Sequence, residues 1–172
     1  MRPFLSVLVL GCALLQAACV SNTGTKVVHE PIKLDLHVEA ASNVNPDDEK
    51  RAAPIIVRVY ELKNVDAFNA SDFFSLQDKD KSVLNDDLVV RDQFQLRPGE
   101  SKTIQRIADQ ATTTLGVLAA YRDLPNSVWR ATWTLPSAPP QAWYRWGQKV
   151  KLTIRLDTNA IKITDEQPQS RK

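Results

Sequence analysis

The stretch Ile55-Ile56-Val57-Arg58-Val59-Tyr60-Glu61-Leu62 is the clearest strand signal in the sequence. It is rich in β-branched and aromatic residues and contains neither glycine nor proline, which favours a central β-strand. The segment before it, from Ile32 to Ala40, alternates apolar and polar residues with a period of two. That pattern is typical of a strand with one buried and one solvated face. We therefore expect a fold built mainly from strands.

The chain after Leu62 continues the same pattern. Further strands are predicted at 88–96, 101–107, 115–121, 129–135, 150–156 and 161–163. The turn residues Arg97-Pro98-Gly99-Glu100 predict a hairpin of 88–96 with 101–107, and Asp157-Thr158-Asn159 predict a second hairpin at the C-terminal end. About eight strands with regularly spaced turns predict an all-β, two-sheet β-sandwich.

Two segments interrupt the strands. Residues 67–84 contain Ala70-Ser71-Asp72, which is typical of a helix N-cap, followed by Phe73 and Leu76 on one side of a short helix. Residues 42–54 are polar and carry the turn residues Asn45-Pro46-Asp47, so we expect an exposed loop there.

The first 18 residues have the layout of a signal peptide, with a basic start, an apolar middle and two small residues, Ala17 and Ala18. Small-small-Cys at this point resembles the bacterial lipobox and predicts lipidation of Cys19, although Gln16 stands where that motif usually has leucine. Processing at Cys12 is an alternative that leaves only about seven apolar residues. A soluble periplasmic protein cleaved without acylation is another.

The predicted organisation has four parts. Residues 1–18 are the signal peptide, 19–31 the lipidated cysteine and a tether, 32–164 the β-sandwich domain, and 165–172 a polar tail. The tether, from Val20 to Glu30, can span at most roughly 36 to 40 Å. Because Val20 follows the cysteine where an aspartate would favour inner-membrane retention, bacterial sorting rules imply the outer membrane.

Composition excludes several functions. The 172 residues include 22 basic and 20 acidic side chains, for a net charge of +2. We therefore expect no positive electrostatic potential strong enough to attract nucleic acid. The only cysteines are Cys12 and Cys19. The domain that follows them can therefore hold no disulfide, no thiolate metal site and no cysteine nucleophile.

Catalytic motifs are also missing. The sequence has no G-x-S-x-G, S-x-x-K or H-E-x-x-H, and its two histidines, His29 and His37, fall in the tether and on a solvated strand face. Residues 78–82 alternate oxygen ligands but lack the glycine and glutamate of a calcium loop, so we expect a solvated turn. No enzyme, cofactor or metal is predicted, while a convergent carboxylate pair stays open.

Two other features each allow two interpretations. The aromatic group Trp143-Tyr144-Trp146 is either an interface or membrane contact or, as we favour, a loop folded over the end of the sandwich. Arg122-Asp123 either faces a partner or, as we favour, forms an intramolecular ion pair that closes a strand end.

The order of several motifs resembles the TssJ (SciN) family, the outer-membrane lipoproteins of bacterial type VI secretion systems. The resemblance spans 34–163. The most specific matches are Asp72-Phe73-Phe74-Ser75-Leu76 and Ala119-Ala120-Tyr121-Arg122-Asp123-Leu124 ahead of Trp129-Arg130. The motifs that accompany them are Arg58-Val59-Tyr60-Glu61-Leu62, Phe68 and Phe94-Gln95-Leu96-Arg97-Pro98-Gly99-Glu100.

This resemblance implies a transthyretin-like sandwich with a small helical insertion. It also implies a non-enzymatic protein, lipid-anchored on the periplasmic face of the outer membrane, that binds the periplasmic C-terminal domain of TssM and through it TssL. In the family the loop between the first two strands is tied to TssM binding. The corresponding candidates are Asn45, Pro46, Asp47, Asp48, Glu49, Lys50 and Arg51. The alternative is a transthyretin-like periplasmic lipoprotein that binds a ligand or peptide, which a sizeable apolar pocket would indicate.

Overall fold

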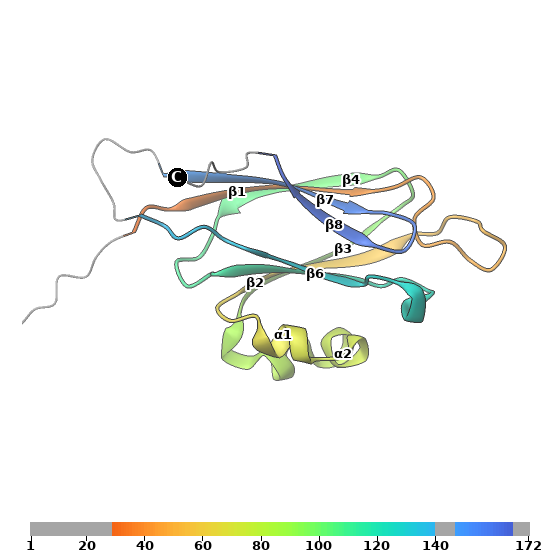
Figure 1. Ribbon diagram of the computed structural model, residues 1–172, viewed down its shortest axis with the longest axis horizontal. Coiled ribbons are helices and arrows are strands. Elements are labelled where there is room, and N and C mark those ends of the chain that lie inside the picture. Colours follow the sequence, from red (N-terminus) through yellow and green to blue (C-terminus); the bar gives the residue numbers. More distant parts are fainter. Residues whose placement is uncertain (1–28, 140–146, 167–172) are drawn as a thin grey trace, which may run out of the picture.

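The computed structural model describes residues 29–139 and 147–166 as a sandwich of two four-stranded sheets (Figure 1). The signal peptide, Cys19, the tether before His29, the aromatic group 143–146 and the tail from 167 onward lie outside these residues. The expected all-β, two-sheet sandwich of eight strands with a helical insertion is confirmed.

One sheet has the strand order β4-β1-β7-β8. The strand β1 (Ile32–Ala40) pairs antiparallel with β4 (Ser101–Ile107) and parallel with β7 (Gln148–Leu156). The edge strand β8 (Ile161–Asp165) pairs with β7 across the predicted C-terminal hairpin. Alternate residues of β1 point into the core, as the period of two requires, and the polar ones between them form the outer face.

The other sheet has the order β3-β2-β5-β6. The strand β2 (Ile55–Leu62) lies between β3 (Leu88–Leu96) and β5 (Thr114–Ala119), and β6 (Arg130–Thr134) follows β5. This sheet is covered on both faces. Val57 and Val59 belong to the core between the sheets, whereas Tyr60 packs with the helical insertion. That is why β2 and β5 carry so few solvated positions.

The helical insertion between β2 and β3 consists of α1 (Asp66–Ala70), α2 (Phe73–Leu84) and the short 3-10 helix η1 (Asn85–Asp87). A second 3-10 helix, η2 (Leu124–Asn126), lies between β5 and β6. Figure 1 shows α1 and α2 on the outer side of the β3-β2-β5-β6 sheet. The predicted N-cap is confirmed, because Ser75 N–H donates to Asp72 Oδ1 at 2.9 Å. Phe73 and Leu76 are buried against the sheet as expected.

The expectation of a solvated turn at 78–82 is wrong. These residues belong to α2, and Asp80 is buried. Arg91 Nη1 donates to Asp80 Oδ2 at 2.8 Å, and Tyr60 Oη donates to the same oxygen at 3.2 Å. Arginine and tyrosine donors from the strands below compensate the buried carboxylate, which the alternation of charges along the sequence cannot indicate.

The predicted hairpin of 88–96 with 101–107 is also wrong. β3 pairs with β2, whereas β4 pairs with β1 in the opposite sheet, so the turn 97–100 crosses between the sheets. Gly99, at a φ of 77°, donates its N–H to Ala40 O at 3.1 Å and so ties this turn to the end of β1. Turn residues predict a chain reversal, but they do not determine which sheet each strand joins.

Candidate partner-binding surface at the loop end of the sandwich

Three connections meet at one end of the sandwich, which we call the loop end. They are the β1–β2 loop, the segment after β5 and the β7–β8 turn. In Figure 1 the β1–β2 loop projects beyond the sheets on the right, whereas the described chain begins at His29 on the left. The loop end therefore lies opposite the end of the sandwich at which the described chain begins.

The tip of the β1–β2 loop is organised around Asp47. Its Oδ1 accepts from Glu49 N–H at 3.0 Å and Arg51 N–H at 2.9 Å, and its Oδ2 accepts from Arg51 Nε at 2.8 Å. The hydrogen bonds from the backbone and side chain of Arg51 hold the pKa of Asp47 below its usual value. Asp47 is thus a structural centre of the loop and remains ionised at neutral pH.

The base of the loop is buried, which corrects the expectation of an exposed loop throughout. Val44 and Asn45 are both buried. The Asn45 side chain donates to Pro54 O at 2.9 Å and accepts from Arg122 N–H at 2.8 Å, while its own N–H donates to Thr158 O at 3.0 Å. One asparagine therefore joins all three connections of the loop end.

The segment after β5 turns outward at Tyr121. This tyrosine is buried, burial raises the pKa of its phenol, and its hydroxyl donates to Asp157 O at 3.2 Å. The next two side chains, Arg122 and Asp123, are exposed. Asp123 accepts from Asn126 Nδ2 at 2.9 Å, and neither Arg122 nor Asp123 forms an ion pair with any other described residue. The intramolecular ion pair that we favoured is therefore wrong.

Ion pairs brace the β7–β8 turn. Asp157 Oδ2 lies 3.0 Å from Lys162 Nζ, and its Oδ1 accepts from Arg155 Nε at 2.8 Å. Hydrogen bonds from Lys162 and Arg155, together with their charges, lower the pKa of Asp157. Arg155 Nη1 also reaches Glu39 Oε1 on β1 at 2.7 Å. The turn is consequently held in place relative to the end of β1.

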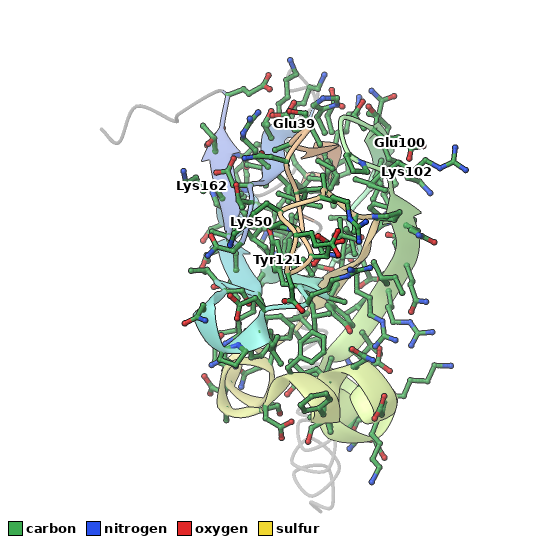
Figure 2. All side chains as sticks on the ribbon, turned by 90° about the vertical axis from the view of Figure 1, so that its right-hand side faces the viewer. Glu39, Lys50, Glu100, Lys102, Tyr121 and Lys162 are labelled. Carbon is green, nitrogen blue, oxygen red and sulfur yellow. The ribbon has the colours of Figure 1, made fainter. Side chains whose placement is uncertain are left out.

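Between these three connections lies a polar depression of about 470 Å³. Figure 2 views this end of the molecule and labels Lys50 and Tyr121, two of its lining residues. The lining residues are Asn45, Pro46, Asp47, Asp48, Lys50, Tyr121, Arg122, Asp123, Thr158 and Asn159. Exposed groups of both signs, Asp48 and Lys50 among them, rim a surface suited to a polar protein partner.

The structure brings most of the predicted loop residues to this depression. Five of the seven candidates line it, whereas Glu49 and Arg51 lie beside Asp47 and hold the loop tip. Tyr121, Arg122 and Asp123 are not among the site residues predicted from the sequence, which indicated only a turn at Thr158-Asn159. Their positions next to predicted strand ends were the available signal. The parallel pairing of β7 with β1, which brings the β7–β8 turn beside the β1–β2 loop, could not be predicted from the sequence.

Both histidines make contacts with neighbouring groups of the fold. His29 hydrogen bonds Ala138 O at 2.9 Å, and His37 lies on the outer face of β1 beside Glu39. Among residues 29–139 and 147–166, no three His, Cys, Asp or Glu side chains gather as a metal site would require. The described chain is thus a β-sandwich domain with a polar depression at its loop end, which is the candidate binding surface.

Comparison with known proteins identifies the family. A family model described as "Type VI secretion lipoprotein, VasD, EvfM, TssJ, VC_A0113" matches residues 32–159, and the chain belongs to this family. No curated protein matches the chain. The expected TssJ (SciN) membership is confirmed.

Solved structures similar to this chain support the same family. The T6SS lipoprotein TssJ1 from Pseudomonas aeruginosa is 40% identical, with a TM-score of 0.70 over 79% of this chain and 97% of that one. Serratia marcescens Lip, described as a membrane bound component of the type VI secretion system, is 30% identical, with a TM-score of 0.70 over 78% and 98%. A chain from a type VI membrane complex (22% identity, TM-score 0.64, 77% and 97% covered) shares the fold. So does one from a structure described as the EAEC TssM C-terminal domain (20% identity, TM-score 0.59, 77% and 97% covered).

The chain is therefore a type VI secretion lipoprotein of the TssJ family. Within the part that the structure describes, neither helix is long and apolar enough to cross a membrane. Signal peptide and acyl anchor fit the lipoprotein family.

Proposed function

We propose that this protein is a non-enzymatic adaptor that tethers the type VI membrane complex to the outer membrane. In this proposal Cys19 carries the acyl chains on the periplasmic face, and the loop end binds the periplasmic C-terminal domain of TssM, which in turn contacts TssL. The observation that carries the proposal is the convergence of three connections on one polar depression opposite the tether. Such loops on a rigid sandwich are typical recognition sites.

Two further observations support this function over the alternative of a periplasmic ligand carrier. The lining of the depression is largely charged and polar, unlike the mostly apolar pocket that a small-molecule carrier uses. Chains of the same fold also occur in structures described as a type VI membrane complex and a TssM C-terminal domain.

The binding surface is tested by charge reversal of groups that do not hold the loop together. Asp48→Lys combined with Arg122→Glu changes two exposed rim side chains, and we expect at least a tenfold loss of affinity for a purified periplasmic fragment of TssM, measured by calorimetry. Thermal unfolding should be nearly unchanged. The matched control is Lys63→Glu with Asp78→Lys, two exposed residues away from the loop end, after β2 and on α2. Equal affinity of the test and control variants would remove the loop end from the interface.

The anchor is tested separately. Cys19→Ser should abolish palmitate labelling and release the protein from the outer-membrane fraction, because two or more acyl chains are needed for durable attachment. Retained labelling would reassign the anchor to Cys12. Protein that is membrane-bound without any acyl label would contradict lipid anchoring altogether.

A further inference from the structure

A second surface lies at the opposite end of the sandwich, where the tether enters. In the β4-β1-β7 part of the sheet, Lys33 of β1 is in register with Ile107 of β4 on one side and with Lys149 of β7 on the other. These three residues form the first outward-facing row of the sheet, and Lys33 follows Pro31 by two positions. We call them the tether-end row.

The tether-end row contains an apolar side chain that is exposed to solvent. Ile107 is 60% exposed, one of the few large apolar side chains that the described residues leave in solvent. With Lys33 and Lys149 it borders a shallow depression of about 460 Å³ on the outer face of the sheet. An apolar side chain flanked by two lysines has the composition of surfaces that bind lipid headgroups.

The charges of the row are available to an external anion. Lys33 has no ion-pair partner among the residues that the structure describes, and its side chain is exposed. Lys149 Nζ lies 2.9 Å from Asp35 Oδ2, but more than half of the Lys149 side chain remains in solvent. Both ammonium groups can therefore contact an external phosphate while the strands keep their positions.

We infer that the tether-end row rests on the phospholipid bilayer that carries the acyl anchor, with Ile107 at the headgroup boundary and Lys33 and Lys149 against anionic phosphates. This inference rests on the proposed acylation of Cys19. A short tether keeps the row at high effective concentration near the lipid, so that a contact of only millimolar strength is enough to orient the domain.

The contact would determine the direction of the partner surface. The nine residues of β1 run from the tether-end row to the loop end. At about 3.3 Å per residue, this strand spans roughly 30 Å. A domain resting on its tether-end row therefore directs the polar depression away from the membrane, toward a partner that approaches through the periplasm.

The test uses the acylated full-length mature protein in vesicles of phosphatidylethanolamine and phosphatidylglycerol. Because the domain has no cysteine, Ile107→Cys provides one free thiol for an environment-sensitive fluorophore. Val128→Cys is the matched control, since Val128 is 55% exposed and bridges Ala160 near the loop end. We expect headgroup spin-labelled lipid to quench the probe at position 107 at least threefold more than the probe at 128. Equal quenching would overturn the inference.

A charge variant tests the lysines. Lys33→Glu should reduce the quenching at position 107 by at least half, whereas Lys81→Glu, the same change at an exposed position of α2, should leave it unchanged. Quenching that does not respond to Lys33→Glu would contradict the phosphate contact. Failure of the anchor proposal has a different signature, because wild-type protein would then not float with the vesicles and Cys19 would take up the fluorophore.

Discussion

The side-chain oxygen of Asn45 accepts a hydrogen bond from the backbone N–H of Arg122 at 2.8 Å, across 77 positions of sequence. This bond joins the β1–β2 loop to the segment that follows β5. Asn45 also adopts a positive φ of 50°, a conformation that asparagine tolerates better than most residues. The partner-binding surface that we propose therefore depends on a residue that is itself buried.

Replacing Asn45 by alanine should destabilise the protein by about 2–4 kcal/mol, because it leaves the Arg122 N–H and the Pro54 carbonyl without their partner. Urea unfolding monitored by circular dichroism measures the change. The matched control is Asn43→Ala, which removes one exposed hydrogen bond to Thr158 Oγ1 and should cost no more than about 0.5 kcal/mol. Similar losses for both variants would contradict the central position of Asn45.

The second prediction concerns the buried ion pair between the sheets. Glu61 of β2 is fully buried and bonds Arg106 of β4, which also pairs with Asp92 of β3. Arg106→Met should lower the free energy of unfolding by about 3 kcal/mol or more, because the carboxylate of Glu61 stays buried without its cation. Chemical denaturation provides the measurement. Arg97→Met, which changes an exposed arginine, should have an effect within about 0.5 kcal/mol.

The third prediction follows the pH dependence of Asp80. Burial alone would raise its pKa, but the hydrogen bond and charge of Arg91, with the Lys81 N–H and Arg58, hold the pKa below the usual 3.8. A carboxyl group with a lowered pKa stabilises the fold at neutral pH, and this contribution disappears as the pH falls below about 3.8 through the folded-state value. The free energy of unfolding of the wild type should therefore decrease over that range.

Asp80→Asn should remove about 2–3 kcal/mol at pH 7 and make the acid dependence shallower than in the wild type, since the titrating group is gone. Urea unfolding at pH 7, 5 and 3 measures both effects. The control is Asp78→Asn on the exposed side of α2, which should leave the acid dependence as it is. An unchanged slope in Asp80→Asn would contradict the role of this ionised carboxylate in fastening α2 to the sheet.

The fourth prediction concerns Gly116 in the middle of β5. A Cβ atom at this position would lie 3.2 Å from both Leu62 Cδ1 and Phe68 Cζ. Gly116→Ala should therefore destabilise the protein by about 1–3 kcal/mol and displace the ring of Phe68, which near-ultraviolet circular dichroism detects. Gly99→Ala meets no neighbouring atom and should affect only the turn, at about 1 kcal/mol for its positive φ. A native aromatic spectrum in Gly116→Ala would argue against this contact.

Local patterning was sufficient to predict most of the elements. The alternation in β1 and the β-branched run of β2 correspond closely to the strands in the structure. The N-cap of α2, Asp72, lies in the predicted segment Ala70-Ser71-Asp72. These features depend on residues close together in sequence, since the direction of a side chain from a strand follows from its position alone. The cysteine positions likewise predict an acyl anchor, which stays a prediction.

Only the tertiary structure decided what depends on pairing between distant segments. The turn at 97–100 was recognisable in sequence, but its crossing from one sheet to the other follows from the pairing of β4 with β1. The burial of Asp80 and Asn45 follows from donors and acceptors supplied by other strands and loops. A polar residue has the same sequence signal whether it is solvated or buried with partners, because only the fold determines which groups reach it.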